Sequence, residues 1–116
     1  MKLETRYTDE VKTEEFSIFF TNYPDVVFVL VSDDGEDVAI ATADNLSDIE
    51  DAAATDWIEI HNFGVKVQNH GYGNQLVKLI QERYSLIEAH EVLKAAEGFW
   101  TKMGFEQNGE VWTWTK

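Results

Sequence analysis

The segment QNHGYGNQLVKLI, from Gln68 to Ile80, carries the most informative pattern in the chain. Two glycines, Gly71 and Gly73, stand between an apolar segment and a run of residues with helical spacing. This pattern predicts a strand, a tight turn and a helix. Glycine permits positive φ at such a turn and lets a ligand approach the backbone closely. The first N–H groups of a helix lack intrahelical partners and lie at the positive end of its dipole, so the turn predicts an anion cradle.

Two well-known phosphate-binding turns do not fit this stretch. A P-loop places Lys-Ser or Lys-Thr directly after its last glycine, and neither glycine here is followed by such a pair. A dinucleotide-binding turn needs a third glycine where this chain has Leu76. Two glycines are also compatible with a plain connection between a strand and a helix. The turn alone therefore leaves a ligand site and a purely structural turn both open.

Several segments outside the turn alternate in polarity or form short apolar runs, and these are predicted to be strands. They cover 2–7, 26–32, 37–43, 57–63 and 85–90, and a last hairpin turns at Asn108 and Gly109. Strict alternation along the 57–63 strand would place Glu59, His61 and Phe63 on one face of the sheet.

Two helices are predicted in the first half of the chain. One begins at Thr8 and ends near Pro24, and its apolar face would carry Phe16, Phe19 and Phe20. A short second helix is predicted where Ser47 and Glu50 have the spacing of a capping box.

Two more helices are predicted in the second half. One runs from the glycines to about Tyr84, and the other ends at Gly104, which fits a left-handed C-cap. The apolar face of the last helix is formed by Leu93, Ala96, Phe99, Trp100 and Met103. The order of elements indicates a single α/β or α+β domain over residues 1–116, with a mixed sheet.

The composition is that of a globular protein. Apolar residues make up 44% of the chain and aromatic residues 13%, which is enough for a hydrophobic core. There is no cysteine, which excludes disulfides, thiolate metal ligands and a cysteine nucleophile. No apolar run has transmembrane length and the N-terminal residues lack the apolar core of a signal peptide. We therefore expect a soluble, cytoplasmic protein with no membrane partner.

The charge is strongly negative and uneven. Residues 1–56 contain fifteen acidic and three basic residues, residues 57–116 contain seven acidic and six basic ones, and the formal net charge is −13. Such a field attracts cations and repels nucleic acids, so we expect no nucleic-acid partner. Taken alone, the acidity is also compatible with a role in solubility only.

A family resemblance rests on two motifs. The segment from Gln68 to Gly73, followed by Leu76, resembles the Q/R-x-x-G-x-G/A motif of the GNAT (Gcn5-related N-acetyltransferase) superfamily. About 26 residues later, GFWTKMGF (Gly98 to Phe105) is similar to the second landmark of that superfamily, an aromatic pair on a helix followed by Lys-x-Gly-Phe. The resemblance implies a mixed, mostly antiparallel central sheet of six to seven strands flanked by helices.

The resemblance also implies acetyl-CoA as the cofactor. The glycine turn would hold the CoA diphosphate with backbone N–H groups, and the pantetheine arm would lie in a gap between the 57–63 and 85–90 strands. The residues expected to bind the cofactor are Phe63, Val65, Val67, Gln68, Asn69, His70, Gly71, Tyr72, Gly73, Asn74, Trp100 and Lys102. Lys66 and Lys78 are further candidates for neutralising phosphates, and all three lysines are also compatible with a solvated surface.

The implied reaction is acetyl transfer to a primary amine of a protein, a polyamine or a small molecule, by direct attack in a ternary complex. It needs no protein nucleophile, in agreement with the absence of cysteine and of a GxSxG elbow. Glu59 and His61 are the candidate general bases, and each is also compatible with a solvated strand face. A backbone N–H near Phe63 or Val65 is expected to polarise the thioester carbonyl.

Two departures from the superfamily pattern bear on catalysis. Many members have Tyr at the position of Trp100, where it protonates the leaving thiolate, and an indole N–H is too weak an acid to replace it. Many also have Asn near Leu93. Tyr72 is the candidate replacement acid, and Tyr84 is an alternative that fits the core better. The departures keep open a second reading, a catalytically weak or inactive regulator on the same fold that binds acetyl-CoA or a basic protein partner.

The N-terminal helical region is short for the superfamily. About eighteen residues separate the first two strands, which leaves room for one helix where the family commonly has two. This predicts an open acceptor site, and a homodimer is one way to complete it. Because the acidic excess lies in this half of the chain, we expect a cationic amine acceptor.

A small protein with this charge can also act without catalysis, by mimicking a nucleic acid or capping a basic partner. A metal site is not expected, because His61, His70 and His90 show no ligand spacing in the sequence.

Overall fold

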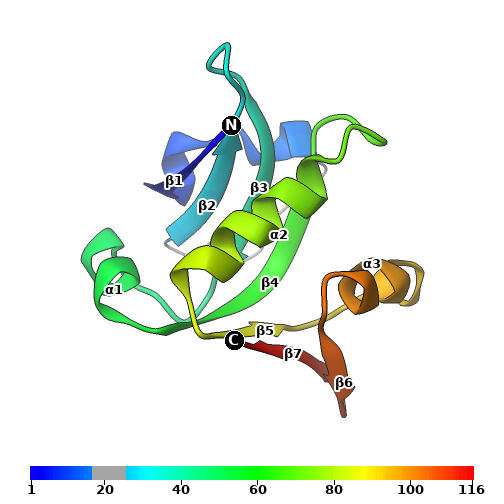
Figure 1. The fold of residues 1–116 in the computed structure, drawn as a ribbon. Coiled ribbons are helices and arrows are strands. Elements are labelled where there is room, and N and C mark those ends of the chain that lie inside the picture. Colours follow the sequence, from blue (N-terminus) through cyan, green and yellow to red (C-terminus); the bar gives the residue numbers. More distant parts are fainter. Residues whose placement is uncertain (17–25) are drawn as a thin grey trace.

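The computed structural model describes residues 1–16 and 26–116. Within them, seven strands form one sheet in the order β1-β2-β3-β4-β5-β7-β6 (Figure 1). The strands are β1 (Lys2–Tyr7), β2 (Val26–Val31), β3 (Asp37–Ala43), β4 (Trp57–Val65), β5 (Leu86–Ala89), β6 (Glu106–Asn108) and β7 (Val111–Thr115). The helices are α1 (Ile49–Ala54), α2 (Tyr72–Arg83) and α3 (Glu97–Lys102), with 3₁₀ turns η1 (Thr8–Glu10), η2 (Thr13–Phe16) and η3 (Lys94–Ala96). None of the described helices is long and apolar enough to span a bilayer.

The sheet is mixed and mostly antiparallel, as predicted. Neighbouring strands are antiparallel except β4 and β5, which run parallel and are joined by α2. A parallel pair needs such a crossover, because a tight turn cannot bring the chain back to the same end of the sheet. The glycine turn therefore lies at the carboxyl end of β4, where α2 begins.

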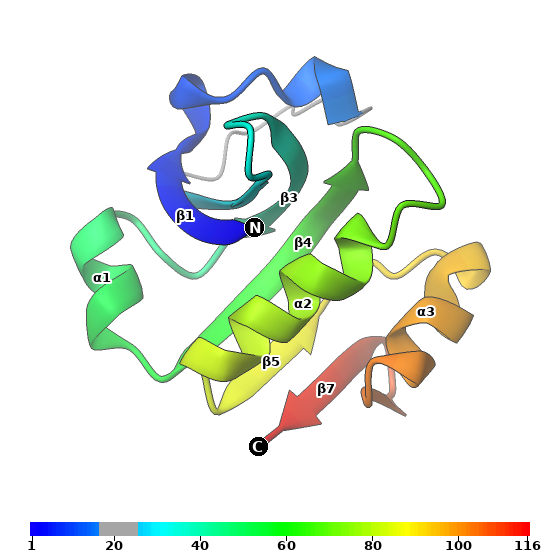
Figure 2. The ribbon, with the colours of Figure 1, turned by 45° about the horizontal axis from the view of Figure 1, so that its top comes forward.

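The core occupies both faces of the N-terminal half of the sheet. One face is covered by α2 (Figures 1 and 2). Its Leu76, Val77 and Ile80 are buried in the core there. On the other face Phe16 of η2 forms a cluster with Val27, Val29 and Val31, which alternate along β2, and with Ile40 of β3. Burial on both faces explains why β2 is a continuous apolar run rather than an alternating one.

A bulge in β4 overturns one prediction from strict alternation. Ala43 of β3 is opposite Ile60, whereas Ala41 is opposite Phe63, so β4 carries one extra residue between these pairs. The bulge returns Phe63 to the face of Ile60, and both pack into the core under α2. Phe63 therefore does not share a face with Glu59.

The predicted helix starting at Thr8 is also wrong. The chain becomes extended at Val11, with φ −127° and ψ 138°, which ends η1 after one turn. A second short turn, η2, then places the buried Phe16 against the sheet. The other parts of this prediction, Phe19, Phe20 and Pro24, lie outside the described residues.

Two helix boundaries differ from the predictions. The cap of α1 is Asp48, whose carboxylate accepts a hydrogen bond from the Asp51 N–H at 2.8 Å, rather than Ser47. The α-helix α3 begins only at Glu97, and Leu93 precedes η3 with its side chain 75% exposed. Leu93 therefore lies on the surface and not on the apolar face of a long helix.

Candidate functional site

β4 and β5 separate after four paired residues. Their parallel register runs from Trp57 opposite Leu86 to Ile60 opposite Ala89, and the His90 N–H donates the last hydrogen bond to the Ile60 carbonyl at 2.8 Å. Glu91 then adopts φ 54°, an uncommon conformation for a residue with a side chain, and the chain turns away. β4 continues beyond the end of β5 (Figure 2).

The separation leaves one edge of β4 free within the described part of the chain. The Lys66 N–H donates to the Val38 carbonyl of β3 at 2.9 Å. Because successive residues of a strand direct their N–H and C=O groups to opposite sides, those of Val65 and Phe63 face the gap. A free backbone edge of this kind can pair with an extended ligand that carries amides.

The glycine turn presents unpaired N–H groups to the same gap. Gly71 has φ 73° and is the N-cap of α2, and no side chain caps the helix. The first intrahelical bond is from the Gln75 N–H to the Gly71 carbonyl, at 3.1 Å. No acceptor in residues 1–16 and 26–116 reaches the N–H groups of residues 72–74. These groups and the helix dipole favour an anion at this position.

Gly73 has a different role from Gly71. A Cβ atom at Gly73 would lie 3.3 Å from Cε1 of Phe63 and 3.4 Å from Cε1 of Phe99. Glycine therefore lets the first turn of α2 pack closely against β4 and α3.

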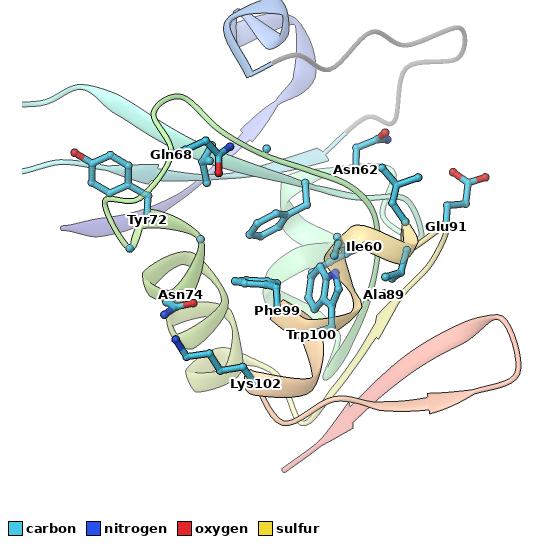
Figure 3. Close-up of a pocket in the computed structure, with 18 of the residues that line it drawn as sticks. Ile60, Asn62, Gln68, Tyr72, Asn74, Ala89, Glu91, Phe99, Trp100 and Lys102 are labelled. Atoms are coloured by element: carbon cyan, nitrogen blue, oxygen red, sulfur yellow. The ribbon is translucent and has the colours of Figure 1, made fainter.

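The gap and the turn open onto one cleft of about 1010 Å³ (Figure 3). Every residue predicted to bind the cofactor lines it: Phe63, Val65, Val67, Gln68, Asn69, His70, Gly71, Tyr72, Gly73, Asn74, Trp100 and Lys102. The opposite wall is formed by residues 89–93 and Ala96. The end of the 85–90 strand was expected beside the gap, whereas the segment after it was not among the predicted cofactor residues.

Lysines near the cleft differ in their availability. Lys102, at the end of α3, lines the cleft. Lys66 is held by Glu36 at 2.8 Å and by Glu15 at 3.4 Å, which raises the pKa of its ammonium group. Lys78 is exposed on α2 and does not line the cleft. Lys102 is therefore the lysine best placed to meet a phosphate.

Trp100 forms part of an aromatic wall. It is only 4% exposed, and its ring centroid lies 5.4 Å from that of Phe63, 5.1 Å from that of Phe99 and 4.8 Å from that of Phe105. Edge-to-face contacts of this kind fix the rings in place. Trp100 thus shapes the cleft and offers no hydroxyl to it.

The two candidate acid tyrosines lie in different places. Tyr72 lines the cleft beside the turn, where its ring stacks on His70, and in Figure 3 it points away from Trp100. The Tyr84 hydroxyl donates to the Ala52 carbonyl at 2.7 Å, and burial raises the pKa of this phenol. Tyr84 therefore belongs to the core, as its sequence position indicated.

The two candidate bases are in contact with each other. Nε2 of His61 lies 2.8 Å from Oε1 of Glu59, and both side chains are half-buried. His61 lines the cleft, and Glu59 lies behind it, outside the lining. His90, which the sequence analysis did not place here, stacks on His61 with ring centroids 4.6 Å apart.

A sequence signal for His90 exists. Glu59-Ile60-His61 on β4 and Glu88-Ala89-His90 at the end of β5 are two Glu-x-His segments on predicted strands. The parallel register places Glu59 opposite Glu88, which brings the two segments side by side. Only the pairing of β4 with β5, which the sequence alone does not reveal, shows that the two segments are neighbours.

Comparisons with known proteins locate the fold. No family model matches the sequence, and no curated protein matches it. The structure of Tetrahymena Gcn5 superposes with a TM-score of 0.63 at 9% identity, over 99% of this chain and 96% of that one. A protein from Exiguobacterium sp. 255-15 named as an acetyltransferase gives 0.57 at 15% identity, over 99% and 94%. A GNAT-family acetyltransferase from Listeria monocytogenes 4b F2365 gives 0.51 at 13% identity, over 78% and 63%.

Proposed function

The chain has the fold of the GNAT acetyltransferases, and from this premise we propose that it is an acetyl-CoA-dependent N-acetyltransferase acting on a primary amine. The observation that carries the proposal is the gap between β4 and β5 directly beside an uncapped glycine turn. A diphosphate and an amide-rich arm attached to it need these two features next to each other.

The turn supplies the groups for the diphosphate of CoA. The free N–H groups of residues 72–74 point at one place, and Gly71 adds no Cβ that would block a phosphate. Lys102 contributes a positive charge at the cleft, and Gln68 adds a side-chain amide. The remaining arm would extend from here towards the strands.

The free edge of β4 supplies the groups for the pantetheine arm and the thioester. Phe63 and Val65 present backbone N–H and C=O groups that pair with the amides of the arm. One of these N–H groups polarises the thioester carbonyl as negative charge develops on its oxygen. The aromatic wall around Trp100 excludes water from one side of the arm.

The Glu59–His61 pair supplies the base. The acceptor amine is protonated at neutral pH and must lose a proton before it can attack. His61 lines the cleft and can accept this proton directly, and the Glu59 carboxylate next to its Nε2 stabilises the imidazolium that forms. The pair lies on the face of the sheet opposite α2, so the amine would approach from the side opposite the turn.

The leaving thiolate must also gain a proton. Trp100 cannot supply the proton. Tyr72 stays the predicted acid, although its ring lies beside the turn rather than beside Trp100 (Figure 3). A thiol is acidic enough to leave as the thiolate near neutral pH, so water can protonate it afterwards without a protein acid.

A second candidate function rests on Trp100. Because an apolar indole fills the place where many members carry Tyr, the chain is also suited to bind acetyl-CoA without turnover, as a regulator. This candidate shares the cofactor site and differs only in the chemical step.

The experiment is an acetyl-CoA titration by calorimetry, followed by a product screen by mass spectrometry over lysine peptides, polyamines and small amines. We expect one acetyl-CoA per chain and an acetylated product of at least one amine class. Binding without product across all classes would favour the regulator. No binding of acetyl-CoA at millimolar concentration would overturn both readings and favour an acidic protein that caps a basic partner.

A further inference from the structure

The carboxylate of Glu59 faces two imidazoles. Its Oε1 lies 2.8 Å from Nε2 of His61 and 3.5 Å from Nε2 of His90. The two rings are stacked with an interplanar angle of 10°, which brings both Nε2 atoms to the same oxygen. The three side chains are half-buried, so solvent reaches them while the sheet holds them in place.

This cluster carries an excess of negative charge. Glu88 lies 3.1 Å from Nε2 of His90, and Asp44 lies 3.9 Å from Nδ1 of His61. No lysine or arginine of the described ranges pairs with Glu59, Glu88 or Asp44, and residues 17–25 contain neither amino acid. Three carboxylates around two imidazoles therefore have no fixed countercharge and attract a cation.

We propose that Glu59, His61 and His90 form a binding site for a divalent transition metal of the Zn²⁺ class. Their ligand atoms all lie within 4.8 Å of one another. Ligands of a tetrahedral Zn²⁺ are roughly 3.3 Å apart, since each bond is about 2.0–2.1 Å long. The separations of 2.8 and 3.5 Å between the Glu59 oxygen and the two Nε2 atoms bracket that value. Because the two rings are almost parallel, they would have to tilt towards each other to direct both lone pairs at one ion.

The surroundings fit a metal site as well as the ligands do. When Nε2 of His61 binds an ion, its Nδ1 carries the proton, and the Asp44 carboxylate lies on that side. Carboxylate–histidine–metal arrangements of this kind orient the ring and strengthen the bond. Imidazole ligands favour Zn²⁺, Ni²⁺ and Cu²⁺ over Mg²⁺ and Ca²⁺, which prefer oxygen. The expectation of no metal site, drawn from spacing in the sequence, did not include the strand pairing that brings His90 to His61.

A metal at this position would also affect catalysis, and this consequence rests on the proposed function. In the proposed base, Nε2 of His61 faces the Glu59 carboxylate and Nδ1 accepts the proton of the amine. An ion bound to Nε2 and to the Glu59 oxygen keeps the ring proton on Nδ1, so no ring nitrogen is left to accept the proton of the amine. The metal would therefore inhibit acetyl transfer and compete with the protonated amine for the cluster.

The test is a Zn²⁺ titration of the full chain without a histidine tag and without acetyl-CoA, by calorimetry and by competition with a chromophoric chelator. We expect one Zn²⁺ per chain, with at least a tenfold weaker affinity in His61→Gln and in His90→Gln. His70→Gln removes the third histidine, which lies outside the cluster, and should bind Zn²⁺ like the wild type. Mg²⁺ at the same concentration should not compete.

Thermal unfolding supplies a second measurement that does not depend on stoichiometry. Zn²⁺ should raise the Tm of the wild type and of His70→Gln but not that of His90→Gln. The absence of Zn²⁺ binding, wild-type affinity in both cluster variants, or loss of binding in His70→Gln instead would each overturn the metal site.

Inhibition by Zn²⁺ is measured separately from Zn²⁺ binding, so that the prediction of inhibition can be contradicted while the metal site stands. Acetylated product is followed by mass spectrometry, because the free thiol of CoA itself binds Zn²⁺. One equivalent of Zn²⁺ should lower the rate at least tenfold, and EDTA should restore it. Zn²⁺ binding with an unchanged rate would overturn the overlap with the base. A metal-free chain that transfers no acetyl group would count against the proposed function, not against the metal site.

Discussion

Position 73 is where the site can least accommodate a side chain. Gly73→Val would place its Cβ about 3.3 Å from the Phe63 ring and fill the space between α2 and β4. We expect the Kd for acetyl-CoA to rise at least tenfold, which corresponds to about 1.4 kcal/mol of binding free energy. Calorimetric titration with acetyl-CoA measures this change.

Gly98→Ala is the matched control for that variant. A Cβ at Gly98 meets nothing within 4 Å, and Gly98 lies in α3 with an ordinary φ. Alanine should leave the affinity within about twofold, and it should stabilise the helix by roughly 0.5–1 kcal/mol. Equal affinities of the two variants for acetyl-CoA would show that close packing at Gly73 does not matter for binding.

Glu59 is the second residue with a sharp prediction. Glu59→Gln keeps the shape of the side chain but removes the charge that stabilises a protonated His61. We expect kcat to fall about 10²- to 10³-fold, with the Kd for acetyl-CoA almost unchanged. Initial rates of product formation measured in EDTA, together with the titration, separate the two effects.

Glu106→Gln on the exposed strand β6 makes the same chemical change away from the cleft and should keep the wild-type rate. If Glu59→Gln and His61→Gln both retained more than half of the wild-type rate, this pair would not be the base.

At the scale of elements, Tyr84 joins the end of α2 to α1. Its buried hydroxyl donates to the Ala52 carbonyl at 2.7 Å, and Tyr84→Phe would leave that carbonyl without its donor. We expect a loss of about 1–2 kcal/mol in the free energy of unfolding at neutral pH, measured by urea denaturation.

The pH dependence of this loss follows from the raised pKa of Tyr84. Burial favours the protonated phenol and so raises the pKa of Tyr84 in the folded state above its usual value of 10.0. The stabilisation is therefore complete below about pH 10 and decreases as the pH rises through the folded-state pKa. The difference between wild type and Tyr84→Phe should be constant from pH 7 to 9 and smaller at pH 11. A difference that grew with pH would contradict the burial of this phenol.

The sequence predicted the elements more reliably than their details. The GNAT fold expected from the two motifs is confirmed, because strands, glycines and aromatic pairs are local signals that the pattern carries directly. The bulge in β4 was not predictable, because the order of polar and apolar residues in this strand does not show where an extra residue is inserted. The polar Asn62 fits either pattern. The first helix failed because packing of Phe16 against the sheet outweighed local helix propensity.

The lining of the cleft and the Glu59, His61 and His90 cluster show the same limit of prediction from local sequence. Most of the predicted lining is contiguous in sequence, from Phe63 to Asn74, and the second motif adds Trp100 and Lys102. The opposite wall comes mainly from the segment after β5. Its position depends on the left-handed conformation of Glu91. Residues other than glycine rarely adopt this conformation, so no local sequence pattern predicts it.

At the scale of the whole molecule, the charge of −13 bears on the acceptor. A negative field steers cations towards the protein, and salt screens it over about 10 Å at 0.1 M. We expect kcat/KM for a lysine peptide with basic flanks to fall roughly tenfold between 20 and 500 mM salt. A peptide with the same lysine and acidic flanks should show a smaller or opposite change. Equal rates for the two peptides at every salt concentration would contradict a cationic acceptor.

The central claim is that the backbone at the glycine turn and at the edge of β4 binds acetyl-CoA. The most direct measurement is a ¹H–¹⁵N correlation spectrum of the labelled chain titrated with acetyl-CoA. The largest changes should occur at the amides of residues 71–74, with a second group at Phe63 and Val65. A spectrum in which these amides stayed in place while others moved, or in which nothing moved at millimolar acetyl-CoA, would contradict the claim.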